Sequence, residues 1–202
     1  MPRVKYGNFV KKLRKASFFT YRQVESVMGR SYAKLWIHKM LERGEIAKLA
    51  KGCYTFKHSP YLLATVLGKA YIGLGSAAFL HGLWNQVISV HVLSPLAGIR
   101  VREGRREICG FKVVIRKISE KMYFGFTEIF LEDVGEWVRV SDPEKTLIDM
   151  LYYSYPFLEE ILPALSCAAN RKKLEEYIGI MKRRGVRGWK RIRDALVRER
   201  IL

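Results

Sequence analysis

The sequence predicts an α+β protein with a small helical module, then an α/β domain with a mostly antiparallel sheet, and C-terminal helices. Three observations predict this class: helical spacing and capping signals near the start, β-prone runs between glycines in the middle, and two amphipathic segments at the end. With 202 residues and 49% hydrophobic content, the chain is long enough for a small domain and a larger one. We expect them at residues 1–58 and 59–202.

The charge of +18, from 37 Lys and Arg against 19 Asp and Glu, is unevenly distributed along the chain. Residues 1–58 carry 14 basic and 3 acidic side chains (+11), residues 59–170 carry 11 and 12 (−1), and residues 171–202 carry 12 and 4 (+8). Because a phosphate-binding surface has to be local, the two basic ends predict an acidic partner. A generic lysine-rich surface is the alternative, and the scarcity of Asn and Gln points to a thermophilic source.

Two helices are expected at the start of the chain. The first covers residues 5–13, where apolar residues recur at helical spacing. The second is expected to begin at Thr20, because Thr20 can cap the amide of Gln23 while the Gln23 side chain reaches back to Thr20. Phe19 can pack on Val24 as a hydrophobic staple, which strengthens this prediction.

A third helix is predicted to follow at once, with Ser31 as its N-cap and Gly44 at its end. Its buried stripe consists of Ala33, Trp36, Ile37, Met40 and Leu41. Two short helices joined by a tight turn at Gly29 and Arg30 are typical of a helix-turn-helix. Short β-prone runs at residues 45–49 and 53–56 predict a hairpin after them, so we expect a winged helix-turn-helix.

The side chains that the buried stripe leaves outside are expected to face DNA. A helix fits the major groove, where Ser, Tyr, Lys and His can donate to base edges, while flanking Arg and Lys contact the backbone without choosing a sequence. The predicted DNA-binding residues are Arg22, Arg30, Ser31, Tyr32, Lys34, His38, Lys39, Lys48 and Lys51. A winged helix used for protein contacts, or a solvated lysine-rich helix, is the alternative.

In the middle of the chain, β-prone runs lie between glycines and short apolar helices precede them. Helices are predicted at residues 61–68 and 77–80, with strands at residues 87–93, 108–115, 128–131 and 136–140. Ser76, in a run of small residues, would allow close helix packing, and His81 is expected to cap a helix C-terminus.

A further helix is predicted to begin after residue 141. Ser141 or Asp142 would cap it, Pro143 suits its first turn, and Glu144 favours the positive end of its dipole. Asp149 is expected to hydrogen-bond a neighbouring backbone amide. We assign Ser76, His81, Asp142, Glu144 and Asp149 structural roles.

Three blocks carry a resemblance to a known family: AKGCY at residues 50–54, YIGLGSAAFLHGL at 71–83 and RVSDPEKTLIDML at 139–151. In this order, over roughly residues 6–153, they resemble the AbiEi-like family of transcriptional regulators, which act as antitoxins in type IV toxin-antitoxin systems. The resemblance implies an N-terminal module that represses its own operon. It also implies a C-terminal domain that antagonises a nucleotidyltransferase-type toxin, usually without a stable complex; a stand-alone repressor would look similar.

The enzyme classes that we considered lack their expected residues. GLGS at residues 73–76 resembles the glycine-serine loop of nucleotidyltransferases, but no pair of metal-binding carboxylates follows it. The three cysteines, Cys53, Cys109 and Cys167, form neither a zinc pattern nor a disulfide framework. We predict no enzyme, no catalytic residues, no metal and no cofactor, with a metal-dependent nuclease or nucleotidyltransferase-like enzyme as the minor alternative.

The apolar stretch at residues 61–84 contains Lys69, His81 and four glycines, so we expect core helices there and no membrane span. With no signal peptide pattern at the start, we expect a cytoplasmic protein.

The basic tail is predicted to form two amphipathic helices at residues 170–184 and 189–201. Their cations form a solvated face, or else a second surface that extends the DNA footprint or binds RNA. The residues of this second surface would be Arg171, Lys172, Lys173, Arg183, Arg184, Arg187, Lys190 and Arg191. We therefore predict a sequence-specific DNA-binding regulator that acts as an autorepressing antitoxin. An RNA- or toxin-binding module without operator specificity is the alternative.

Overall fold

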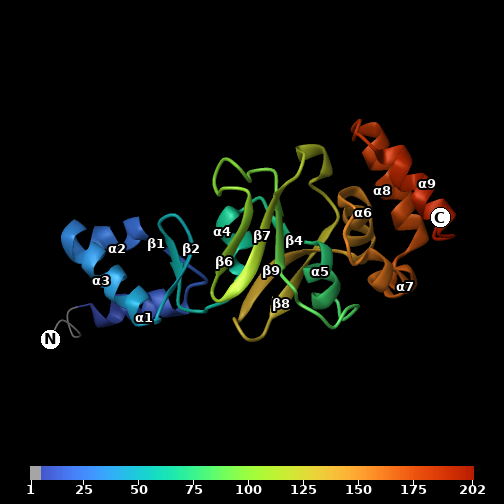
Figure 1. Cartoon of the computed structure of the whole chain (residues 1–202). Helices are drawn as coiled ribbons and strands as arrows, with labels where there is room; N and C mark the ends of the chain where they lie inside the picture. The colour runs from blue at the N-terminus through green and yellow to red at the C-terminus, as the bar shows by residue number, and fades with distance from the viewer. Residues whose placement is uncertain (1–5) are drawn as a thin grey trace.

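The computed structural model describes residues 6–202. Figure 1 shows three parts in a row: a small helical unit with its own strands, a central sheet, and a group of helices at the C-terminal end. Helices and a mixed sheet occur in one chain, so the predicted α+β class is confirmed.

The first unit contains three helices and a small three-stranded sheet. Its elements are α1 (Gly7–Lys15), β1 (Phe19–Thr20), α2 (Tyr21–Met28), α3 (Arg30–Glu42), β2 (Ala47–Ala50) and β3 (Cys53–Thr55). The strands lie in the order β1-β3-β2, and both pairs are antiparallel. Lys5, where the first helix was expected to begin, lies outside the described residues.

The start of α2 matches the predicted capping box. The Gln23 backbone N–H donates to the Thr20 hydroxyl at 3.3 Å, and the Thr20 N–H donates to Gln23 Oε1 at 2.7 Å. Phe19 and Val24 are both buried in the apolar cluster of this unit.

The predicted N-cap of the third helix was wrong. Gly29, at φ +78°, holds the N-cap position, and α3 begins at Arg30 without a side-chain cap. A positive φ is accessible to glycine at little cost, so the chain turns from α2 into α3 within one residue. Ser31 consequently lies in the first turn of α3, exposed to solvent.

The central region forms a six-stranded sheet flanked by two short helices. Its elements are α4 (Leu62–Leu67), β4 (Tyr71–Ile72), α5 (Leu74–Leu80), β5 (Val90–Ser94), β6 (Gly104–Ile108), β7 (Phe111–Lys117), the 3-10 turn η1 (Glu120–Met122), β8 (Phe126–Leu131) and β9 (Glu136–Ser141). The strand order is β6-β7-β5-β4-β9-β8. Three pairs are antiparallel, and β5–β7 and β4–β9 are parallel.

The sheet corrects two sequence predictions. The run at residues 108–115, predicted as one strand, contains a two-residue turn at Cys109 (φ +54°) and Gly110 (φ +78°), so it belongs to the β6–β7 hairpin. Positive φ at both central positions suits the twist of a tight hairpin. Strand β4 has only two residues and was not predicted from the sequence; it lies between β5 and β9.

Four helices follow the sheet: α6 (Pro143–Tyr153), α7 (Leu158–Ala168), α8 (Arg171–Arg183) and α9 (Trp189–Arg198). The Asp142 side chain caps α6 by accepting from the Lys145 N–H at 2.8 Å, as predicted. The two predicted tail helices correspond to α8 and α9. The sequence did not predict α7, which contains Pro163.

The first unit has its own apolar cluster; a second cluster lies between one part of the sheet and the C-terminal helices, and a third lies between the sheet and α4. Leu49 of β2 is buried in a cluster of the sheet, beside α4. Lys57 Nζ lies 2.5 Å from Glu136 Oε1 of β9. The two parts are therefore joined through the β2–β3 hairpin and the segment after it.

Within residues 6–202, none of the helices has both the length and the apolar composition needed to cross a membrane.

Candidate nucleic-acid interface

The exposed face of α3 carries a mixture of polar, cationic and apolar side chains. Ala33, Ile37 and Met40 are buried against the unit, and the helical repeat turns residues between them outward. The outward side chains are Ser31, Lys34, Leu35, His38, Lys39 and Glu42. Leu35 is 47% exposed, unusual for a leucine with a buried stripe on the same helix. Leu35 was not among the predicted DNA-binding residues, although its offset from the buried stripe already placed it on the outside of the helix.

Five predicted cations surround this face and are exposed. They are Arg22 on α2, Arg30 at the turn, Lys39 on α3, Lys48 on β2 and Lys51 in the hairpin turn. None of the five forms an ion pair with a carboxylate of residues 6–202. Their charges are thus available to an anionic partner.

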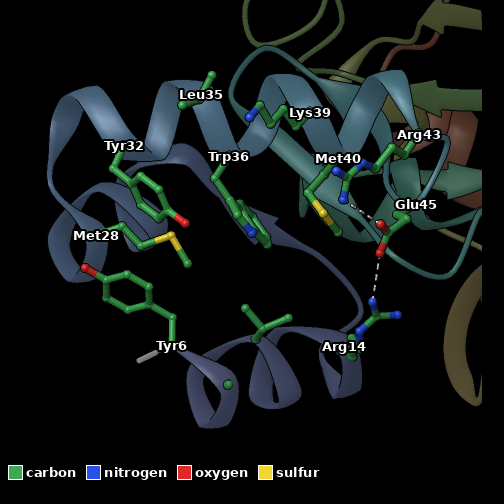
Figure 2. A pocket seen from close by; sticks show the side chains of 12 residues that line it. Tyr6, Arg14, Met28, Tyr32, Leu35, Trp36, Lys39, Met40, Arg43 and Glu45 are labelled. Carbon is green, nitrogen blue, oxygen red and sulfur yellow. Dashed lines mark hydrogen bonds and ion pairs between the residues drawn. The ribbon is translucent and has the colours of Figure 1, made fainter. Parts of the chain in front are cut away.

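Two predicted contact residues have partners inside the unit. Tyr32 is half-buried, and its ring centroid lies 5.7 Å from that of Tyr6, so it points toward α1 and not outward as expected. Figure 2 shows it beneath α3, facing the first helix. His38 Nε2 lies 3.2 Å from Glu42 Oε1, and this contact competes with any base contact of the imidazole.

A pocket of about 570 Å³ lies between α1 and α3, on the inner side of the exposed face (Figure 2). Its walls include three aromatic rings and two methionine side chains, which belong to Tyr6, Tyr32, Trp36, Met28 and Met40. At one end, Glu45 Oε2 lies 3.1 Å from Arg14, and Glu45 Oε1 lies 3.9 Å from Arg43. These ion pairs tie the ends of α1 and α3 to the start of the hairpin, which orients α3.

The predicted tail residues fall into two groups. Arg171, Lys172, Arg183, Arg187 and Lys190 are exposed, and of these Arg171 pairs with Glu175 at 3.4 Å. The other three have partners in the body of the protein: Lys173 lies 3.0 Å from Asp142 and 3.1 Å from Glu144, Arg184 donates to the Lys121 carbonyl, and Arg191 donates to the Tyr152 carbonyl. This second group links the tail to the body; Lys173 is paired with two carboxylates, whereas Arg184 and Arg191 remain exposed.

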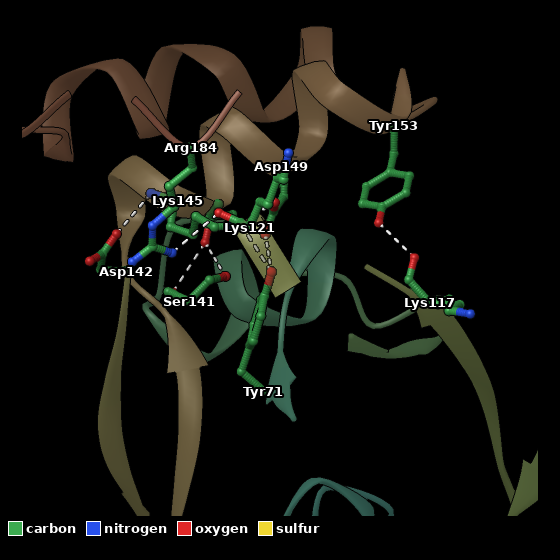
Figure 3. Close-up of polar contacts among 10 residues, drawn as sticks. Tyr71, Lys117, Lys121, Ser141, Asp142, Lys145, Asp149, Tyr153 and Arg184 are labelled. Carbon is green, nitrogen blue, oxygen red and sulfur yellow. Dashed lines mark hydrogen bonds and ion pairs between the residues drawn. The ribbon is translucent and has the colours of Figure 1, made fainter. Parts of the chain in front are cut away.

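A buried charged network beneath the tail was not predicted (Figure 3). Lys145 and Asp149, one helical turn apart on α6, are fully buried and form an ion pair. The Tyr71 hydroxyl donates to Asp149 Oδ2 at 2.8 Å and lies 2.9 Å from Lys145 Nζ. Asp149 therefore bonds two side chains and not a backbone amide, as we had expected. A lysine and an aspartate four residues apart among apolar residues was the signal for this pair.

Burial dominates the ionisation of this network. Loss of hydration lowers the pKa of Lys145 and raises that of Asp149, while their mutual attraction opposes both shifts. Loss of hydration, followed by the Asp149 charge, raises the pKa of Tyr71. Tyr71, Lys145 and Asp149 have no exposure to solvent, so we assign them a structural role in supporting the tail.

The remaining motif residues link elements of the body. The Ser76 hydroxyl donates to the Ser89 carbonyl and accepts from the His91 N–H, both at 2.9 Å. His81 is the C-cap residue of α5, and its Nε2 lies 2.8 Å from the Ser141 carbonyl. Glu144 accepts from the Asn170 N–H at 2.7 Å, which connects α6 with the start of α8.

The glycine-serine segment at residues 73–76 is buried by packing. A side chain at Gly75 would place its Cβ 2.7 Å from Trp84 Cζ3, and one at Gly73 would lie 2.6 Å from Leu93. A nucleotide has no access to this segment. Among residues 6–202, no three His, Cys, Asp or Glu side chains gather where they could hold a metal ion.

Comparisons with known proteins agree with the N-terminal geometry. Residues 10–57 match the model of a family described as transcriptional regulator, AbiEi antitoxin. The match covers α2, α3 and the β2–β3 hairpin, with most of α1. A search of curated proteins finds no match. The family match confirms the resemblance of this chain to the AbiEi-like transcriptional regulators and antitoxins.

Proposed function

We propose that the protein is a sequence-specific DNA-binding regulator whose residues 1–58 act as a winged helix-turn-helix. In this proposal α3 enters the major groove, the β2–β3 hairpin is the wing, and residues 59–202 form the regulatory domain. The observation that carries it is the exposed face of α3 in a segment of charge +11, flanked by cations that have no ion-pair partner among residues 6–202. The family match supports a regulatory role.

Base reading is assigned to the outward face of α3. Ser31 and Lys34 can donate to acceptors on base edges, and the exposed Leu35 can contact a thymine methyl group. His38 can contact a base only if its imidazole gives up its contact with Glu42. Tyr32 supports α3 from behind through its contact with Tyr6.

Backbone contacts are assigned to the flanking cations Arg22, Arg30, Lys39, Lys48 and Lys51. These residues come from α2, the turn, α3 and the hairpin, so together they can hold α3 in one orientation on the duplex. Phosphate contacts position the protein without selecting a sequence.

The antitoxin role is the second part of the proposal. The matched family is described as an AbiEi antitoxin, and the resemblance extends through the motif at residues 139–151. We propose that the chain represses its own operon and counters a nucleotidyltransferase-type toxin of a type IV system. Cells that express an adjacent nucleotidyltransferase gene as the toxin should stop growing, and co-expression of this chain should restore their growth. Growth arrest that continues in the presence of this chain would exclude it as the antitoxin of that toxin.

Gel-shift titration of the full chain with its own upstream DNA, and with random duplex, tests DNA recognition. Lys34→Ala with Lys39→Ala should weaken operator binding at least about tenfold, because it removes one base contact, worth about 1–3 kcal/mol, together with one phosphate contact. Lys11→Ala with Lys12→Ala removes the same charge from the exposed side of α1 and should change affinity by less than about threefold.

Equal losses in the two double variants would show that α3 does not contact the operator. Equal affinity of the unmodified chain for operator and random duplex would support the alternative, a nucleic-acid- or toxin-binding module without operator specificity.

A further inference from the structure

The turn between α8 and α9 carries a dense run of positive charge. Residues 182–193 read KRRGVRGWKRIR and contain no acidic residue. The cations of this run are Lys182, Arg183, Arg184, Arg187, Lys190, Arg191 and Arg193. The run covers the end of α8 (Arg171–Arg183), the glycine-flanked turn and the start of α9 (Trp189–Arg198), so all its cations lie in or next to this turn.

An aromatic ring lies at the centre of this run. Trp189, the first residue of α9, is half-buried and packs against the apolar cluster of the C-terminal helices. Its ring centroid lies 5.7 Å from Lys182 Nζ, 5.9 Å from Lys190 Nζ and 5.6 Å from Arg193 Cζ. One indole is thus held in place by the core and surrounded by three cations from both helices.

The positive charge around Trp189 is mostly uncompensated. Arg193 pairs with Asp194 at 2.7 Å, whereas Lys182 and Lys190 have no carboxylate within ion-pair distance in the described part of the chain. Attraction to the face of an exposed ring is worth only about 0.5–1 kcal/mol per cation. The three cations repel one another, and so weak an attraction offsets only part of this repulsion. A bound anion would reduce it further.

We propose that the α8–α9 turn binds single-stranded nucleic acid, with an unpaired base stacked at Trp189 and the adjoining phosphates held by Lys182, Arg187 and Lys190. Aromatic side chains beside a positively charged groove are the common means of binding single strands, and base stacking on a ring is tolerant of sequence. In a duplex the base faces are already stacked on their neighbours, so the indole favours a single strand.

The anchoring contacts of the turn fit this assignment. Arg184 and Arg191 donate to the carbonyls of Lys121 and Tyr152 and so connect the hairpin to the body, while Lys182, Arg187 and Lys190 have no ion-pair partner among residues 6–202. This site is separate from the face of α3 and does not depend on operator binding.

Fluorescence anisotropy of the full chain with a labelled oligouridylate, an oligothymidylate and a blunt duplex of equal length tests the proposal. Lys182→Gln with Lys190→Gln should lower affinity for the single strands at least about tenfold and reduce the salt slope by about 1.4, at about 0.7 per phosphate. Trp189→Leu should also lower single-strand affinity, and Trp189→Phe should retain most of it. The oligouridylate and oligothymidylate arms distinguish RNA from DNA as the source of the strand.

The control removes the same charge from the same two helices. Lys172→Gln with Arg198→Gln takes one exposed cation from α8 and one from α9, away from Trp189, and should change affinity by less than about threefold. Lys34→Ala with Lys39→Ala should leave single-strand binding unchanged, which separates this site from the proposed operator contact.

Equal losses in the lysine pair and in its control would overturn the proposal, as would single-strand affinity that the lysine pair does not change. Duplex binding as strong as single-strand binding, with the same loss in the lysine pair, would mean a phosphate surface without base stacking and would overturn it too. Because Lys182 and Lys190 are exposed, their replacement tests the site even where Trp189→Leu weakens the packing of α9.

Discussion

The two basic ends of the molecule are attached to the central sheet in different ways. The tail is held by buried polar contacts: Tyr177 donates to Asp142 at 2.6 Å, and the Asn170 N–H donates to Glu144 at 2.7 Å. The N-terminal unit is held by the buried Leu49 and by the Lys57–Glu136 ion pair. Similar charge therefore belongs at one end to an element that buried polar bonds connect to the sheet, and at the other end to a unit with its own core.

A count of charges does not distinguish cations that have partners within the protein from cations that do not. In the tail, Lys173, Arg184 and Arg191 are engaged with the body, so they serve as anchors. Around α3, the five flanking cations have no ion-pair partner in residues 6–202. Whether a cation can bind a phosphate thus depends on the contacts of its side chain and not on the composition of its segment.

The largest expected effect comes from breaking the charged network under the tail. Asp149→Asn leaves Lys145 charged and unpaired in a fully buried site, and should lower the free energy of unfolding by about 3–5 kcal/mol. Urea denaturation, followed by circular dichroism, measures this loss. The double variant Lys145→Met with Asp149→Leu removes both charges and should be more stable than Asp149→Asn. A single variant within about 1 kcal/mol of the unmodified protein would contradict the role of the network.

A second test concerns the pH dependence of stability that the buried His91 causes. His91 of β5 is buried with its ring 5.4 Å from that of Tyr155, and burial, with a smaller contribution from the Arg116 charge, lowers its pKa from 6.5 to about 4. The unfolded chain therefore binds more protons than the folded protein between these values. Stability should fall as pH decreases from about 6.5 to about 4, by at most about 3 kcal/mol.

Thermal unfolding at several pH values, with His91→Gln as the comparison, measures this effect. The variant should show a flatter dependence in that range, because Gln has no proton to gain. An identical pH dependence of the two proteins would show that His91 is not the group responsible.

The local parts of the fold could be predicted from the sequence. The capping box at Thr20 and the cap at Asp142 use partners three residues away, so both were visible in the sequence and both are confirmed. Strand β4 could not be found in this way. It has two residues, and its pairing with β5 and β9 depends on segments far away in the chain.

The candidate sites show the same limit. The exposure of Ser31 and Lys34 followed from the periodicity of α3, whereas the position of Tyr32 depends on Tyr6 of another element. The burial of Lys145 depends on Gly125, whose added Cβ would lie 2.9 Å from Lys145 Cβ. No local pattern in residues 139–151 indicates that approach.

The smallest expected effect tests the attachment of the N-terminal unit. Burial raises the pKa of Glu136, but hydrogen bonds from Lys57 and Ser17 and the Lys57 charge outweigh it, so the pKa lies below its ordinary value of 4.5. This carboxylate stabilises the folded protein above pH 4.5, and its contribution is lost as pH falls through the lowered pKa. A double-mutant cycle with Lys57→Met and Glu136→Gln at neutral pH should give a coupling of about 0.5–1 kcal/mol.

The same cycle at a pH below the lowered pKa of Glu136 should give no coupling, because the protonated carboxyl no longer pairs with Lys57. Coupling of equal size at both pH values would mean that the contact is not ionic. A coupling of this size is small beside the expected cost of Asp149→Asn, so buried apolar contacts such as that of Leu49 contribute more than this ion pair to the attachment of the N-terminal unit.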